Sequence, residues 1–154
     1  RRRIETMLVS GGTTPVDSFH RELGAVMIDR CGISRDAEGL RDGLSRVEAL
    51  EKRFHSEVRV PGEAAGPNAE LEKALRVNDF FGLAQLMLRD ALAREESCGA
   101  HFREEHQSPE GEARRDDVKF AHIAPWEPQA GAEPIPHSEA LQFTALQPST
   151  RSYR

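Results

Sequence analysis

The positions of proline constrain the fold of this chain more than any other feature of its sequence. Proline inside a helix removes a backbone hydrogen bond and costs about 3 kcal/mol. The nine prolines among the 154 residues lie at positions 15, 61, 67, 109, 125, 128, 134, 136 and 148. Two long windows, 16–60 and 68–108, contain no proline, whereas the last third of the chain contains six. Helices are expected in the windows, and extended chain is expected at the end.

The first window has the pattern of two helices. Asp17 or Ser18 can cap the first helix, which ends at Cys31-Gly32, because short polar side chains cap helix N-termini and glycine tolerates the backbone conformation that ends a helix. Ser34 can cap the second helix. Its inward face has the alternating three- and four-residue spacing of a helical stripe, formed by Leu40, Leu44, Val47, Leu50 and Phe54.

The second window predicts the longest helix, which begins after Asn68 and ends at Ser97-Cys98-Gly99. Its apolar face is wide and includes Leu71, Leu75, Phe80 or Phe81, Leu83, Met87, Leu88, Ala91 and Leu92. In the preceding helix, Gly39 and Gly43 indicate a close approach to a neighbour. The fold class expected is mainly α, with an antiparallel three-helix bundle over residues 1–105.

Residues 106–154 are expected to form an extended C-terminal tail that packs on the bundle within one structural domain. Alternating apolar residues predict two short strands, over 118–126 and 140–146, which would form a β-hairpin around a loop at 128–136. The chain begins with three arginines and no methionine. This start indicates a piece of a longer protein.

Composition excludes several classes of function. The 21 basic and 26 acidic side chains give a net charge of −5, and only 6% of residues are aromatic, which argues against nucleic acid as a partner. The longest uncharged run, 140–150, is too short for a membrane helix, which needs about 18 or more apolar residues. The two cysteines do not make a disulfide scaffold, so a reducing cytoplasm is expected.

No motif of the sequence carries chemistry of its own. Glycine-rich phosphate loops and the nucleophile elbow G-x-S-x-G are absent. Cys98, His101 and His106 are close in sequence, but their spacing matches none of the usual zinc ligand pairs. We therefore expect no catalytic, cofactor-binding or metal-binding residue in this chain.

Several segments, in order along the chain, resemble one family. They are Asp17 to Gly24 (DSFHRELG), Val58 to Gly62 (VRVPG), Ser97 to Glu105 (SCGAHFREE), Arg115 to Asp117 (RDD) and Gln147 to Arg154 (QPSTRSYR). Together they are similar to the C-terminal region of the succinate dehydrogenase/fumarate reductase flavoprotein subunit. The segment that contains Cys98 resembles the bacterial, cytochrome b-linked branch, which is often coupled to menaquinone. The resemblance covers essentially the whole chain.

The resemblance implies that the parent enzyme interconverts succinate and fumarate through a covalently held FAD. It also implies that electrons pass to an iron-sulfur subunit, and that a membrane cytochrome b subunit holds the complex on the cytoplasmic face of the cell membrane. The flavin-binding and catalytic residues of the family lie upstream of Arg1, so no cofactor is expected in this part. The family's C-terminal region is a three-helix bundle with a tail that packs on the flavin domain.

By this likeness, His101, Arg103, Arg115 and Asp116 are candidates for contacts with the flavin domain or with the iron-sulfur subunit. The alternative is that they only hold the tail to the bundle. Two other identities remain open, namely the C-terminal domain of L-aspartate oxidase and a free-standing helical interaction module. Because the face that meets the flavin domain would be exposed in the separate chain, self-association is also expected.

Overall fold

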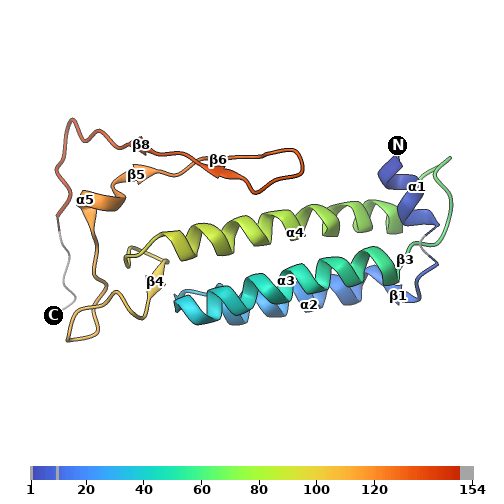
Figure 1. Ribbon diagram of the computed structural model, residues 1–154, viewed down its shortest axis with the longest axis horizontal. Helices are drawn as coiled ribbons and strands as arrows, with labels where there is room; N and C mark the ends of the chain where they lie inside the picture. The colour runs from blue at the N-terminus through green and yellow to red at the C-terminus, as the bar shows by residue number, and fades with distance from the viewer. Residues whose placement is uncertain (1, 10, 150–154) are drawn as a thin grey trace.

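Three long helices form the body of the molecule in this computed structural model, which describes residues 2–9 and 11–149. They are α2 (Val16–Arg30), α3 (Ala37–Glu57) and α4 (Ala69–Ala93), and they run in alternating directions (Figure 1). The predicted mainly helical fold, with an antiparallel three-helix bundle, is confirmed. A short helix that the sequence did not indicate, α1 (Arg2–Leu8), precedes the bundle and contacts α4.

The helix starts show which polar side chains cap the bundle. As predicted, Asn68 caps α4, and its Oδ1 accepts the Leu71 N–H at 3.0 Å. The cap predicted for α3 is wrong, because Asp36 rather than Ser34 accepts the Gly39 N–H, at 2.8 Å. The caps predicted for α2 are also wrong, since this helix begins after Pro15 without a side-chain cap.

The core lies between the three helices and is centred on three phenylalanines, one from each helix. The rings of Phe19 and Phe54 meet edge to face at 5.3 Å, and Phe54 meets Phe81 at 5.4 Å. All three side chains are fully buried. Aromatic pairs in such geometries stabilise a core beyond the area that they bury.

Gly43 lets α3 approach its neighbours closely, as predicted. A Cβ on Gly43 would lie 2.9 Å from Leu88 Cδ2 on α4 and 3.0 Å from Arg30 Cβ on α2. The same prediction is wrong for Gly39, where an added Cβ would meet only the side chain of the cap residue Asp36.

Short parallel bridges tie the two ends of the bundle. At one end β1 (Thr14–Pro15) pairs with β3 (Val58–Arg59), and at the other end β2 (Ser34–Arg35) pairs with β4 (Phe102–Arg103). Neither pairing follows from the residue pattern, because each strand is only two residues long. The second bridge brings the chain after α4 to the beginning of α3.

The tail forms a one-turn helix and an antiparallel hairpin. Helix α5 (Asp117–Phe120) is followed by β5 (His122–Ile123), which pairs with β8 (Glu139–Ala140), and by β6 (Trp126–Glu127), which pairs with β7 (Ile135–Pro136). The predicted hairpin exists, but its strands were placed wrongly. The first strand begins at His122 rather than at residue 118, because residues 117–120 form α5. The second lies within 135–140 instead of 140–146.

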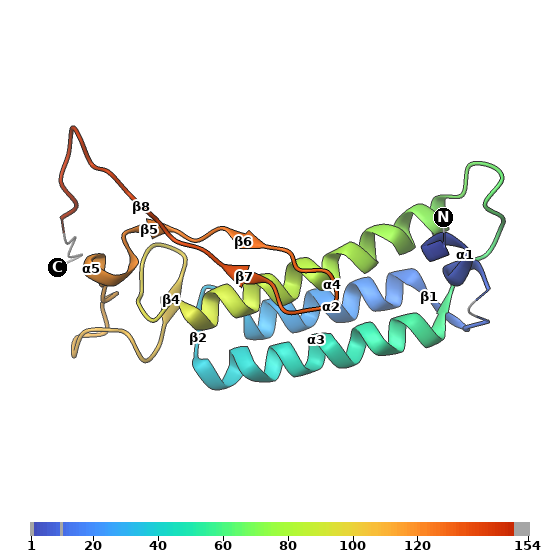
Figure 2. The same ribbon diagram turned by 45° about the horizontal axis from the view of Figure 1, so that its top comes forward.

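Figures 1 and 2 both show the hairpin running along α4. Two polar contacts hold it there. Trp126 Nε1 donates to Asp90 Oδ1 at 2.9 Å, and the Arg89 guanidinium pairs with Glu133 at 2.8 Å. Within residues 2–9 and 11–149, no helix is long and apolar enough to cross a membrane.

Candidate interface at the end of helix α4

Arg103 is buried against the carboxyl end of α4. Its side chain is 3% exposed, and Nη1 donates to the carbonyl oxygens of Ala91 at 2.8 Å, Leu92 at 3.2 Å and Arg94 at 3.4 Å. The last carbonyls of a helix have no partner within the helix and carry its negative dipole end, so a cation is favourable there. Arg103 therefore acts as the C-terminal cap of α4.

Ser97 closes the loop that returns Arg103 to the helix. Its hydroxyl donates to the Arg103 carbonyl at 3.0 Å and accepts the Arg103 N–H at 2.8 Å. α4 ends at Ala93 rather than at the predicted 97–99, since Arg94 is extended and the Ser97 N–H donates to the Arg114 carbonyl instead of to the helix. Gly99 has φ +59°, as a tight turn between residues 98 and 101 requires.

Glu96 joins the helix end to the tail. This carboxylate is 2% exposed, and its Oε1 accepts from Arg94 Nε at 2.9 Å and from Arg94 Nη2 at 2.6 Å. Its Oε2 accepts the Asp116 N–H at 2.7 Å, and the neighbouring Ser97 N–H donates to the Arg114 carbonyl at 2.9 Å. A buried carboxylate is tolerated when it is paired and hydrogen-bonded in this way. The start of α5 is thereby fixed to the bundle.

Glu105 connects the same loop to α3. Its Oε1 accepts the Ala37 N–H at 2.5 Å, and its Oε2 accepts from Arg103 Nε at 3.2 Å. Burial acts to raise the pKa of the Glu105 carboxyl, but the hydrogen bonds from Ala37 and Arg103 outweigh it and hold the pKa below its usual range. A carboxylate at a helix N-terminus is also stabilised by the helix dipole.

His101 converges with Arg103 on a single acceptor. Its Nε2 lies 2.8 Å from the Arg94 carbonyl oxygen, which also accepts from Arg103. Because a carbonyl only accepts, Nε2 carries the proton in the neutral ring. Burial lowers the pKa of His101, and the nearby charges of Arg35 and Arg94 lower it further, against the raising effect of the bond to Arg94. The half-buried ring is therefore neutral near pH 7.

The other two candidates lie on the surface. Asp116 caps α5, where its Oδ1 accepts the Lys119 N–H at 3.1 Å. Arg115 pairs with Asp117 through Nε at 3.0 Å, and its Nη1 donates to the Ser149 carbonyl at 3.3 Å. The structure thus brings His101 and Arg103 together at the Arg94 carbonyl, connects Asp116 to Arg94 through Glu96, and leaves Arg115 outside this group.

Two residues organise this region together with Arg103 and were not selected from the sequence, namely Glu96 and Ser97. No local pattern distinguishes Glu96 from its neighbour Glu95, yet Glu95 is exposed and pairs with Lys119 at 2.8 Å. The difference arises only when the tail returns to the helix end and buries one of the two carboxylates.

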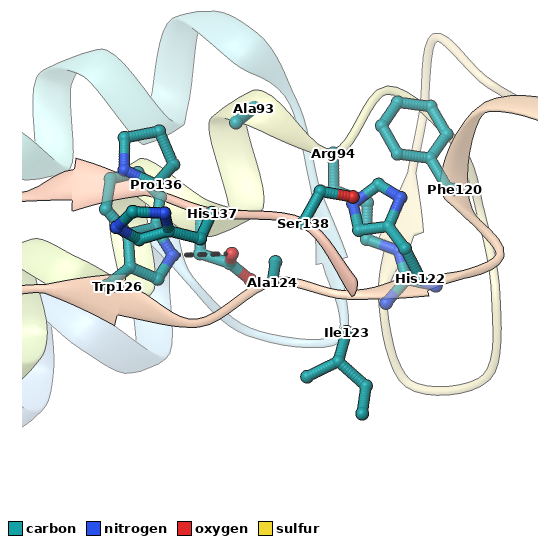
Figure 3. A pocket seen from close by; sticks show the side chains of 11 residues that line it. Ala93, Arg94, Phe120, His122, Ile123, Ala124, Trp126, Pro136, His137 and Ser138 are labelled. Carbon is teal, nitrogen blue, oxygen red and sulfur yellow. Dashed lines mark hydrogen bonds between the residues drawn. The ribbon is translucent and has the colours of Figure 1, made fainter. Parts of the chain in front are cut away.

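A cleft of about 520 Å³ lies between the hairpin and the second half of α4. Figure 3 shows Trp126 and His137 at one end of the cleft, with His122 and Phe120 at the other. His137 Nε2 is 2.8 Å from Glu127 Oε2, so these two side chains pair with each other within the hairpin. Among residues 2–9 and 11–149, no three His, Cys, Asp or Glu side chains are placed to hold a metal ion.

The bundle, the polar cap on α4 and the hairpin tail together form one helical domain. Residues 20–153 match the family described as fumarate reductase flavoprotein C-term, and the chain belongs to that family. It is the C-terminal domain of a flavoprotein subunit of the fumarate reductase and succinate dehydrogenase type.

Individual relatives agree with this assignment. The chain is 30% identical over 153 residues to the fumarate reductase flavoprotein subunit of a Serratia species, covering 99% of this chain and 25% of that protein. It is 31% identical over 120 residues to L-aspartate oxidase 2 of Ralstonia nicotianae, covering 78% of this chain and 20% of that protein. A quinol-fumarate reductase structure with menaquinol matches 96% of this chain, with a TM-score of 0.79 and 26% identity.

Proposed function

We propose that this chain is the non-catalytic docking domain of an FAD-dependent fumarate reductase or succinate dehydrogenase. The observation that carries the proposal is the alignment of nearly the whole chain with only a quarter of a fumarate reductase flavoprotein subunit. Catalysis and flavin binding would then belong to the remaining part of the subunit. The parent enzyme would interconvert succinate and fumarate.

The starts of the three long helices, within residues 11–149, are poorly suited to a flavin, whose pyrophosphate is commonly held by backbone N–H groups at a helix start. At the start of α3, the Ala37 N–H is bonded to Glu105 and the Gly39 N–H to Asp36. The start of α4 is occupied by Asn68, and α2 follows a proline and carries Asp17 in its first turn. FAD would therefore be bound by the upstream part of the subunit alone.

Within the interface proposal, the four candidate residues have two different roles. Arg115 and Asp116 are exposed and would contact the flavin domain or the iron-sulfur subunit directly. His101 and Arg103 would act from within, because their side chains bond to the end of α4 and fix the loop that presents the other two. Assembly with a membrane cytochrome b subunit would place the domain on the cytoplasmic face of the cell membrane.

The separate chain is also expected to self-associate. Large apolar side chains on α2, α4 and the tail are exposed, including Ile28, Leu83, Phe143 and Leu146. Exposed apolar patches commonly mark protein contacts. Light scattering on the 154-residue chain tests this expectation, and a monodisperse monomer at high concentration would contradict it.

The proposed function is tested by comparing this polypeptide with the same gene product extended upstream to its natural start. We expect a flavin absorbance spectrum and succinate-dependent dye reduction in the extended form only. Activity with L-aspartate in place of succinate would favour the second candidate, an L-aspartate oxidase, which the 31% identity to the Ralstonia protein supports. If neither form contained flavin, a helical interaction module would be the remaining interpretation of this chain.

A further inference from the structure

The cleft between α4 and the hairpin has the size and lining of a small-molecule site. Its volume of about 520 Å³ lies within the range of about 300–1,000 Å³ that is common for such sites. The end of α4 forms one wall and the hairpin forms the other (Figure 3). The apolar part of the lining includes Phe120, Trp126 and Pro136. Apart from two histidines, the lining has one acidic and one basic side chain, Asp90 and Arg94.

The side chains of Asp90 and Arg94, both within the described residues 11–149, lie one helical turn apart and form no ion pair. Side chains four residues apart are neighbours on a helix, so aspartate and arginine at this spacing can pair with each other. Here other residues hold them apart. Trp126 Nε1 donates to Asp90 Oδ1 at 2.9 Å, and Glu96 accepts from Arg94 Nε at 2.9 Å and from Arg94 Nη2 at 2.6 Å.

Each of these two charged groups keeps one atom free for a ligand. Asp90 Oδ2 and Arg94 Nη1 have no hydrogen-bond partner among residues 2–9 and 11–149. The His122 ring and the Ser138 hydroxyl also make no hydrogen bond within that part of the chain, and Figure 3 shows them at the same end of the cleft as Arg94. The cleft therefore offers a negatively charged acceptor and, one helical turn away, a positively charged donor with two further polar groups.

A ligand that satisfies both charged groups carries an ammonium group and a carboxylate. An ammonium group only donates and suits Asp90 Oδ2, whereas a carboxylate only accepts and suits Arg94 Nη1. A simple anion would be repelled by Asp90 and a simple cation by Arg94, so a zwitterion gains more than either. An α-amino acid has both groups on one carbon, which fits two side chains one helical turn apart. The aromatic rings in the lining favour an aromatic side chain on this ligand.

We propose that the cleft between α4 and the hairpin binds an aromatic α-amino acid. The ammonium group of the ligand bonds to Asp90, and its carboxylate bonds to Arg94 with help from His122 and Ser138. Its ring packs against Trp126. Because the ligand contacts both walls of the cleft, its binding holds the hairpin against the helix. This site is separate from the proposed docking function, since binding there needs neither the flavin nor catalysis.

The test uses the subunit extended upstream to its natural start, with L-phenylalanine as the probe. Succinate is present at saturation, so that any site for dicarboxylates elsewhere in the subunit is filled. Hydrogen–deuterium exchange with mass spectrometry follows peptides from the hairpin, with a peptide from α3 as the internal control. A ligand at about ten times its Kd slows exchange through the unbound state about tenfold. A titration to about 20 mM covers the affinity expected of so small a ligand.

We expect L-phenylalanine to slow exchange in the hairpin peptides about tenfold and to leave the α3 peptide unchanged. No change in the hairpin at any concentration would overturn the proposal. Two analogues then test the charged contacts, since phenylpropionate lacks the ammonium group and phenethylamine lacks the carboxylate. Each should bind at least about tenfold more weakly, because one hydrogen bond between charged groups is lost. Equal protection by either analogue would contradict the assignment of a zwitterion, and equal protection by glycine would contradict the role of the ring.

A variant of Asp90 locates the binding in the cleft. Asp90→Asn removes the negative charge but keeps an oxygen that can accept from Trp126, so exchange in the hairpin without ligand should match that of the parent. It should weaken L-phenylalanine binding at least about tenfold and leave phenylpropionate binding no weaker. The matched control is Glu139→Gln, which removes an exposed charge from the same hairpin outside the cleft lining. Unchanged L-phenylalanine binding in Asp90→Asn, or an equal loss in Glu139→Gln, would contradict the proposal.

Discussion

Replacing Arg103 with alanine should destabilise the chain strongly, and the structure allows an estimate of the loss. The guanidinium donates to the Ala91 carbonyl at 2.8 Å and to the Leu92 carbonyl at 3.2 Å, while its contact with Arg94 O at 3.4 Å is weak. A hydrogen bond to a charged group contributes about 1.5–3 kcal/mol. Water can reach some of the carbonyls in the variant, so the lower end applies. We expect a loss of about 3 kcal/mol in the free energy of unfolding.

Urea unfolding followed by far-ultraviolet circular dichroism measures this loss, provided that the slope of the transition is unchanged. Arg103→Lys keeps the charge but not the planar fork, so it should lose roughly half as much. The matched control is Arg41→Ala on the exposed side of α3, which should change stability by less than about 0.5 kcal/mol. If Arg103→Ala behaved like Arg41→Ala, the reasoning about the helix cap would be refuted.

Three further predictions concern other parts of the fold. Gly43→Ala should destabilise the bundle by about 1 kcal/mol in urea unfolding, because overpacking outweighs the gain in helix propensity. Gly82→Ala, whose added Cβ would meet no atom within 4 Å, should stabilise it. The opposite order of stabilities would contradict the packing argument. Folding lowers the pKa of His101 below its unfolded value of about 6.5, so the stability that His101 contributes is complete above that pH and is lost as the pH falls through the folded pKa. His101→Gln should therefore reduce the loss of unfolding free energy at acid pH. An unchanged pH profile would exclude His101 as the source of that loss. Trp126→Phe removes the bond to Asp90 and should make the hairpin more sensitive to limited proteolysis than the bundle, with equal sensitivity as the contrary result.

The sequence predicted the elements that depend on local rules. The proline-free windows located the three helices, and the stripe that includes Val47 and Phe54 gave the buried face of α3. Asn68 was predicted correctly as the cap of α4, because asparagine directly before an apolar periodic segment is a preferred N-cap residue. For α3, Ser34 was predicted as the cap, but the parallel bridge to β4, a contact distant in sequence, takes Ser34 into a strand and leaves Asp36 as the cap.

The candidate interface could be predicted only in part, for a related reason. His101 and Arg103 were selected because charged residues are dense after α4, but nothing local shows that Arg103 turns inward to the helix that precedes it. The burial of Glu96 depends on the backbone of Asp116, twenty residues later in the chain. Contacts of this kind are set by how the tail folds back, and no pattern of neighbouring residues encodes that return.

The two parallel bridges at the ends of the bundle have a consequence for the order of folding. Thr14 pairs with Val58, 44 positions away, and Ser34 pairs with Phe102, 68 positions away. Contacts of long sequence separation close large loops and therefore form late, after local helices. On the ribosome, the start of α3 cannot be fixed to its partner strand until residue 103 has emerged. We therefore expect the helices to form first and the bridge at Ser34 to close only when the last third of the chain has been made.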